Sequence, residues 1–234
     1  MPCSLERDDL KKILAGCVKH AGLDDAYVEM IQTRGVSKNF QRDPRKANHR
    51  FIAFAVPFGW ILNPDEFEKG LNVIVSNIRR IPPESVDSKI KNYHWLDLIS
   101  GMFEAYDSNV DSVILVDEGN NISEGPGFNI FCVDATGLNT PDKGVLEGVT
   151  RQTVLDLAEE IKLPVNLKPI SIDMLNDSIE VFATSTAGGI MPITKINNQL
   201  VGNCTPGKVT RQIHKSYWDL HVNSRWTQSV NDLG

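Results

Sequence analysis

Residues 148–163 read GVTRQTVLDLAEEIKL, and they form the clearest periodic stretch in the sequence. Apolar residues recur at helical spacing and Pro164 follows the stretch, so the pattern predicts an amphipathic helix that ends before the proline. Thr150 is a candidate N-cap, because a threonine hydroxyl can accept a hydrogen bond from the first turn. The apolar side of this predicted helix consists of Val154, Leu155, Leu157, Ala158 and Ile161.

Strand-like runs lie on both sides of this helix, at residues 127–137 (GFNIFCVDATG) and 178–190 (SIEVFATSTAGGI). A two-residue hairpin is expected around Asn197 and Asn198. The other expected elements are helices over 5–21, 93–106 and 206–221, strands over 26–35, 51–58, 71–80 and 111–116, and a long polar loop over 36–50. Strands and helices mix irregularly, which favours an α+β fold over a doubly wound α/β sheet.

Composition narrows the class of protein. The chain has 234 residues, 41% of them hydrophobic, and a net charge of −6. This charge argues against a nucleic-acid or anionic-membrane partner. The four cysteines are too far apart for a metal-ligand pair, so no metal site and free thiols are expected. No signal-peptide core and no apolar run of about 18 residues is present, so we expect a soluble, cytoplasmic protein.

Three stretches carry residue types that are typical of an anion and cofactor site. Glu124 precedes a Gly-Pro-Gly turn, Gly148 precedes a helix start that can bind an anion, and hydroxyl residues 184–186 precede two glycines. Each has an ordinary alternative: a solvated glutamate, a simple N-cap or a polar turn. A fourth stretch, SKIKNYHWLD at residues 88–97, brings Lys89 and Lys91 to an apolar segment. Together the four stretches supply what a pyridoxal phosphate site requires: an amine, a partner for the ring nitrogen and a dianion pocket.

The order of these motifs is IKNYHW (90–95), SEGPGFNIF (123–131), TPDKGVLEGVTR (140–151) and FATSTAGGIMP (182–192). This order resembles the fold type IV pyridoxal-phosphate enzymes, which include branched-chain and D-amino-acid aminotransferases, aminodeoxychorismate lyase and R-selective amine transaminases. The residues of these motifs are most similar to those of the R-selective amine transaminases, and the resemblance runs from about Lys11 to His221. It implies an α+β fold of the D-amino-acid aminotransferase type, with an incomplete small N-terminal domain and a larger mixed β domain.

The resemblance also implies roles for individual residues around pyridoxal 5'-phosphate. Lys91, rather than Lys89, matches the Schiff-base lysine that is the catalytic residue. The remaining matches are Glu124 for the ring nitrogen, Leu146 for packing against the ring, Val149 and Thr150 for the phosphate at the helix start, Thr186 for the phosphate on its other side, Arg42 for a substrate carboxylate, and Trp95 for the substrate side.

The activity that the resemblance implies is amino transfer between an amine or amino acid and a 2-keto acid, in a homodimer. The alternatives are a lyase on the same fold, of the aminodeoxychorismate lyase kind, and a shortened relative with impaired catalysis. Family members carry a further N-terminal segment that supplies a phosphate-binding arginine. Arg79 and Arg80 lie on a later strand and are not assigned that role. The implied domains are residues 1–84, residues 85–225 and a tail over 226–234.

Overall fold

The chain forms two compact units, one made of residues 1–59 and 223–234 and the other of residues 60–222. Their structure is a computed structural model that describes residues 3, 5–223 and 225–233. The boundary expected after residue 84 lies inside the second unit, because strand β3 (Leu71–Arg79) pairs with two other strands of that unit's sheet. None of the helices within the described residues is both long and apolar enough to cross a lipid bilayer.

The first unit contains helix α1 (Arg7–Ala21) and an antiparallel hairpin of β1 (Ala26–Ser37) and β2 (Ala47–Pro57). Helix α1 confirms the helix expected over residues 5–21. It ends at Gly22, whose φ of 65° places it in the left-handed region and lets its N–H reach the last helical carbonyl oxygens. A short helical turn, η4 (Val230–Asp232), also belongs to this unit.

The prediction of a loop over residues 36–50 is wrong. Val36 pairs with Asn48 and Ser37 pairs with Ala47, so the connection between the strands is only residues 38–46. It contains two short 3-10 turns, η1 (Lys38–Phe40) and η2 (Pro44–Lys46). Here β1 and β2 form an exposed two-stranded sheet, so polar residues occupy both of its faces. The sequence therefore lacks the alternation of polar and apolar residues that marks a half-buried strand.

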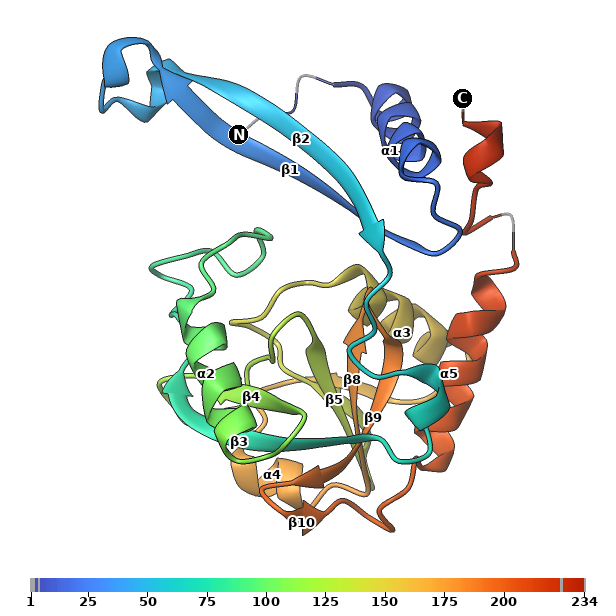
Figure 1. The fold of residues 1–234 in the computed structure, drawn as a ribbon. Helices are drawn as coiled ribbons and strands as arrows, with labels where there is room; N and C mark the ends of the chain where they lie inside the picture. The colour runs from blue at the N-terminus through green and yellow to red at the C-terminus, as the bar shows by residue number, and fades with distance from the viewer. Residues whose placement is uncertain (1–2, 4, 224, 234) are drawn as a thin grey trace. The chain divides into compact units, whose positions relative to one another are not determined.

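The second unit is built on an eight-stranded mixed sheet (Figure 1), in which β4, β3, β9, β8, β5, β6 and β7 lie in that order and β10 pairs with β9. Strand β3 is parallel to β4 and β9, and β8 is antiparallel to both of its neighbours. The other strands are β4 (Ser112–Val116), β5 (Asn129–Asp134), β6 (Gly137–Thr140), β7 (Val165–Leu167), β8 (Glu180–Ser185), β9 (Gly189–Ile196) and β10 (Gln199–Leu200).

Side chains alternate between the two faces of this sheet and form separate cores. On β5, Ile130 and Cys132 belong to one buried cluster, whereas Phe131 and Val133 belong to another. The second cluster is covered by α3 (Val149–Glu160) and α5 (Lys208–Leu220), and in it the rings of Phe131 and Phe182 stack 5.2 Å apart. A third cluster lies between α2 (Leu96–Asp107) and the β3–β4 edge. The sheet therefore holds the connecting loops, which carry the site, on a rigid base.

Most of the expected elements of this unit are confirmed. The helices expected over 149–163 and 206–221 appear as α3 and α5, and Asn197 and Asn198, both with positive φ, form the expected hairpin turn between β9 and β10. The helix expected over 93–106 begins later, at Leu96. The unit also contains η3 (Pro64–Glu66) and the short helix α4 (Ile172–Asn176).

Candidate active site

Lys91 lies in the loop between β3 and α2, the green loop that extends from α2 in Figure 1. Asn92 shapes the loop around it, because its Nδ2 donates to the carbonyl oxygen of Ile90 at 2.7 Å and its Oδ1 accepts from the N–H of His94 at 2.9 Å. A side chain that binds nearby backbone in this way favours a turn over a helix, which explains why α2 begins five residues after Lys91. The Lys91 side chain is exposed.

The two lysines of this loop have different surroundings. Nζ of Lys89 lies 2.9 Å from Oε1 of Glu147, and both side chains are exposed. This ion pair joins the loop to the segment directly before α3. Within the residues that the structure describes, Lys91 takes part in no ion pair. Its amine is therefore available for other chemistry, whereas the amine of Lys89 is engaged.

Glu124 is the buried acid of the candidate site, with 7% of its surface exposed. Its Oε1 accepts from Nε of Arg80 at 3.1 Å, and its Oε2 accepts from the N–H of Leu146 at 2.9 Å. Burial raises the pKa of the Glu124 carboxyl, and the Leu146 N–H and the Arg80 guanidinium oppose that rise. Each carboxylate oxygen has a further lone pair, so Glu124 can still accept a hydrogen bond from a ligand.

Arg80 is the residue of this site that the sequence did not reveal. Besides binding Glu124, its Nη1 lies 2.6 Å from Oδ2 of Asp97, which also accepts from the N–H of Ile81. The ion pair between Arg80 and Asp97 thus joins the two ends of the loop that carries Lys91. Burial acts to raise the pKa of Asp97, but these hydrogen bonds outweigh it and the pKa lies below the usual value.

The only sequence signal for this pairing is that Asp97 ends the SKIKNYHWLD stretch and Arg80 lies eight residues before its start. A charged residue beside an apolar element has many possible partners. Arg80 and Glu124 are separated by 44 residues, and nothing in the local pattern of either one identifies the other. The contact follows from the position of β3 beside β4, which brings the end of β3 close to the segment after β4.

The segment before α3 is connected to Glu124 through Leu146. The carbonyl oxygen of Leu146 accepts from Nδ2 of Asn129 and from the N–H of Gly148, each at 2.8 Å. Gly148 is the N-cap of α3, and a Cβ there would lie 2.5 Å from Oδ1 of Asn129. An added Cβ would therefore displace the buried Asn129 amide, which holds the Leu146 carbonyl before α3.

Thr150 does not cap α3, which corrects the expectation from sequence. The N-cap is Gly148 and the helix has no side-chain cap, so the N–H groups of its first turn remain available to a ligand acceptor. The Thr150 side chain is buried beside Tyr217. Burial raises the pKa of Tyr217 above its usual value, although the hydrogen bond with Thr150 acts in the opposite direction. The N–H groups and the positive end of the helix dipole favour an anion at this point. The Val149 side chain, in contrast, is exposed.

Thr186 lies in the turn between β8 and β9, and its side chain is exposed. The neighbouring residue Ser185 holds this turn, because its Oγ donates to the carbonyl oxygen of Gly127 at 2.7 Å and accepts from the N–H of Ala187 at 3.1 Å. The Gly-Pro-Gly turn after Glu124 is thereby tied to the turn that carries Thr186. Thr184 is buried, and among the described residues its Oγ1 has no hydrogen-bond partner.

Trp95 lies beside the Gly-Pro-Gly turn, because a Cβ on Gly127 would lie 3.6 Å from Cη2 of Trp95. Arg42 is exposed and lies in the β1–β2 connection, between η1 and η2. It belongs to the first unit, whereas the other residues of the candidate site belong to the second.

Hydrogen bonds and close contacts therefore join four separate segments of the second unit: residues 80–97, 124–129, 146–150 and 185–187. They bring together a buried carboxylate, an uncapped helix start, a hydroxyl-bearing turn and a loop with an exposed lysine. This donor set fits pyridoxal phosphate, which has a protonatable ring nitrogen, a dianionic phosphate and an aldehyde that reacts with an amine.

Comparison with known proteins gives a consistent result. Residues 1–196 match the amino-transferase class IV family. A protein of Methanocaldococcus jannaschii, named among the branched-chain-amino-acid aminotransferases, is 29% identical over 97% of this chain and 78% of its own length. The Escherichia coli K12 branched-chain-amino-acid aminotransferase is 27% identical over 98% of this chain and 77% of its own length.

Solved structures agree with the sequence matches. The E. coli branched-chain amino acid aminotransferase superposes with a TM-score of 0.89 at 27% identity, covering 99% of this chain and 79% of that one. The share of a relative's length that this chain covers varies. It is 38% for the Arabidopsis thaliana branched-chain-amino-acid aminotransferase-like protein 2.

Proposed function

Because this chain belongs to the class IV aminotransferases, a family that uses pyridoxal phosphate, we propose that its second unit binds the cofactor at Lys91 and Glu124 and transfers an amino group between a branched-chain amino acid and a 2-keto acid. The observation that carries the residue assignment is the Arg80–Glu124–Leu146 network. It joins a buried carboxylate to the backbone two residues before an uncapped helix start.

Bound pyridoxal phosphate supplies an electron sink that makes a proton on the substrate carbon labile. Glu124 in its carboxylate form would accept a hydrogen bond from the ring N–H and would keep that nitrogen protonated. Arg80 favours this form by placing a positive charge 3.1 Å from Oε1. The buried ion pair thereby opposes, without cancelling, the rise that burial causes in the Glu124 pKa.

Lys91 would hold the cofactor through Nζ. In its free form the same amine would act as the base and acid that moves a proton at the substrate carbon. The Asn92 turn holds the backbone that carries this lysine through two hydrogen bonds of the loop.

The phosphate would be held by N–H groups at the start of α3, contributed by Val149 and Thr150, and by Thr186. Gly148 would permit a close approach because it has no side chain. Leu146 would pack against the ring, Trp95 would lie on the substrate side, and Arg42 would bind a substrate carboxylate. These three assignments rest on the family resemblance.

The branched-chain substrate is supported by the names of the relatives. The sequence resemblance to R-selective amine transaminases gives a second candidate donor. The experiment is a donor screen of the purified chain, supplied with pyridoxal phosphate and 2-oxoglutarate. Turnover of L-leucine supports the proposal, whereas turnover of (R)-1-phenylethylamine alone reassigns the donor. Lyase activity without amino transfer, or no turnover with cofactor bound, contradicts it.

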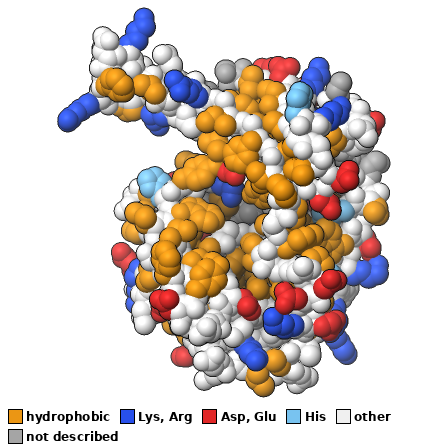
Figure 2. Space-filling view, viewed as in Figure 1, with side chains coloured by type: hydrophobic (Ala, Val, Ile, Leu, Met, Phe, Trp, Pro, Cys, Tyr) orange, Lys and Arg blue, Asp and Glu red, His pale blue; other side chains and the backbone are white. Residues whose placement is uncertain are grey.

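We also propose that the protein works as a homodimer in the cytoplasm. Hydrophobic side chains gather over α2 (Figure 2), where Leu96, Ile99, Phe103 and Tyr106 are spaced three and four residues apart and remain exposed. A contiguous exposed apolar stripe of this kind is typical of an interaction surface, and family resemblance makes a second copy of the chain the expected occupant. Four free cysteines accord with a reducing compartment.

Light scattering tests the dimer. Phe103→Glu should convert it to a monomer, because a charge in an apolar interface is costly. Leu200→Glu is the matched control, because Leu200, like Phe103, is an exposed apolar side chain but lies on β10. A wild-type monomer, or a dimer that tolerates Phe103→Glu, contradicts this interface.

A further inference from the structure

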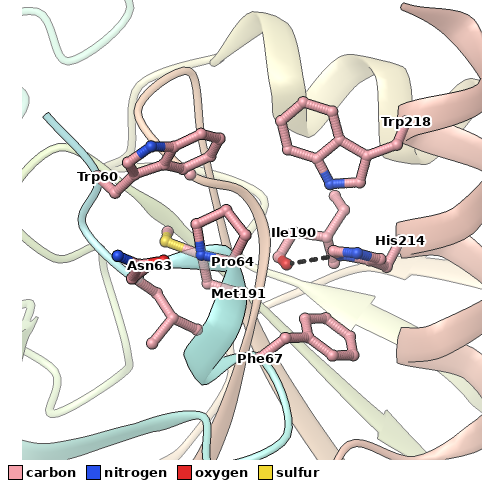
Figure 3. A pocket seen from close by; sticks show the side chains of 10 residues that line it. Trp60, Asn63, Pro64, Phe67, Ile190, Met191, His214 and Trp218 are labelled. Atoms are coloured by element: carbon pink, nitrogen blue, oxygen red, sulfur yellow. Dashed lines mark hydrogen bonds between the residues drawn. The ribbon is translucent and has the colours of Figure 1, made fainter. Parts of the chain in front are cut away.

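A cavity of about 280 Å³ lies in the second unit between η3, the start of β9 and helix α5 (Figure 3). Its walls come from Trp60, Leu62 and Phe67 on one side and from Met191, His214 and Trp218 on the other. No residue assigned above to the cofactor or substrate lines it. The cavity is therefore lined by residues other than those proposed for amino transfer.

The walls of this cavity are mostly aromatic. The rings of Trp60 and Trp218 lie 5.9 Å apart, and those of Phe67 and His214 lie 4.0 Å apart. Leu62 and Met191 are buried beneath them. Planar apolar ligands fit such a site, because aromatic faces offer large contact areas and favour stacked or edge-on ring geometry.

His214 gives the cavity a directional polar group, in addition to the Asn63 amide, whose Oδ1 accepts from the N–H of Asp65. Nδ1 of His214 lies 3.2 Å from the carbonyl oxygen of Ile190, which can only accept, so Nδ1 carries the proton. In the neutral ring Nε2 is then an acceptor, and within the described residues it has no hydrogen-bond partner. Burial lowers the pKa of His214, and nearby Arg211 lowers it further, although the Ile190 carbonyl acts in the opposite direction.

The charges near the cavity compensate each other. Arg211 lies over the Phe67 ring at 5.9 Å, and its guanidinium forms a two-point ion pair with the carboxylate of Glu68. Because Arg211 is already paired with Glu68, it would not neutralise the charge of an anionic ligand. The cavity therefore favours a neutral ligand.

We propose that this cavity binds a neutral, planar aromatic molecule of about two fused rings that donates one N–H or O–H hydrogen bond to Nε2 of His214. The size follows from the volume, since an apolar cavity of about 150 Å³ takes up benzene and this one is nearly twice as large. The proposal concerns binding alone and stands whether or not the proposed amino transfer is correct.

Indole and benzofuran form a matched pair of probes, because they have nearly the same shape but only indole has an N–H donor. Each is titrated into the full-length ¹⁵N-labelled protein, and the indole N–H signals of the four tryptophans are followed. Signals of Trp60 and Trp218 should shift, while those of Trp95 and Trp226 should not. Indole should bind in the range of ~0.1–1 mM, and benzofuran about three- to tenfold more weakly.

His214→Phe should abolish the preference for indole while retaining the apolar contacts. The control is His20→Phe, because His20 also binds a backbone carbonyl through Nδ1 but lies on exposed α1. That variant should keep the preference. Equal affinities in the wild-type protein, shifts confined to Trp95 and Trp226, or no shift at millimolar indole would each refute the proposal. The wild-type comparison decides the matter even if His214→Phe does not fold.

Discussion

Arg80 and Glu124 form a buried ion pair, with Nε of Arg80 3.1 Å from Oε1 of Glu124 and less than a tenth of either side chain exposed. Buried charges require partners, and the loss of one partner leaves the other uncompensated in a poorly solvated place. This pair connects the start of the Lys91 loop to the acid proposed for the cofactor ring.

Arg80→Met should lower the free energy of unfolding by about 3–5 kcal/mol, because Glu124 and Asp97 would both lose their buried cation. The double variant Arg80→Met/Glu124→Gln should recover part of that loss, since it removes one orphaned charge. Urea denaturation measures both. Arg79→Met is the control, because Arg79 is exposed, and it should change stability by less than about 0.5 kcal/mol. A similar effect of the two single variants would contradict a special role of Arg80.

Lys91→Ala should remove the covalent cofactor link, whereas Lys89→Ala should retain it. The physical reason is that the Lys89 amine is held in an ion pair with Glu147, while Lys91 has none among the described residues. The measurement is borohydride reduction followed by peptide mass spectrometry. Cofactor mass on a peptide containing residue 91 is expected in the wild type and in Lys89→Ala. Cofactor still trapped at residue 89 in Lys91→Ala would move the assignment to the other lysine.

Gly148→Ala should weaken cofactor binding at least about tenfold, because the added Cβ would lie 2.5 Å from Oδ1 of Asn129 and would displace the start of α3. The backbone φ of −62° suits alanine, so a steric effect is isolated from backbone strain. Equilibrium titration with pyridoxal phosphate gives the affinity. Gly16→Ala serves as the control, because a Cβ on that helical glycine of α1 meets nothing within 4 Å. Unchanged affinity in Gly148→Ala would remove the helix start from the phosphate site.

The acid stability of the protein should depend on Asp97. Its native pKa lies below the ordinary 3.8, because the hydrogen bonds from Ile81 and Arg80 outweigh burial. The unfolded chain then binds more protons than the native one, so this stabilisation is complete above pH 3.8 and is lost as the pH falls through the native pKa. Urea unfolding should show the wild type losing its advantage over Asp97→Asn on acidification. A difference that stays constant with pH would contradict this.

Glu124 should behave in the opposite way, because burial raises its native pKa above 4.5. The native state then binds more protons than the unfolded state, so the contribution of Glu124 is largest below pH 4.5 and is lost as the pH rises through the native pKa. Relative to Glu124→Gln, the wild type should therefore lose stability as the pH rises across that window. The same unfolding series provides the measurement, and a gain in relative stability over this range would show that Arg80 outweighs burial.

Local patterns predicted much of the second unit. The helix at 149–160 and the turn at Asn197 and Asn198 follow from features a few residues apart, such as apolar periodicity and positive-φ residues. The prediction of a loop over 36–50 was wrong because it also relied on local patterns. The strands in this region are defined by pairing across the hairpin, and a polar, exposed sequence gives little local sign of that pairing.

Residue type and short spacing were enough to predict the order of the motifs, the α+β class and two turns suited to a phosphate. Three contacts could be seen only in the folded chain: Arg80 binds Glu124, Gly148 rather than Thr150 is the N-cap of α3, and Lys89 pairs with Glu147. The reason is distance along the chain: such contacts arise only when the strand order of the sheet brings separate loops together, and no local pattern encodes which loops will meet.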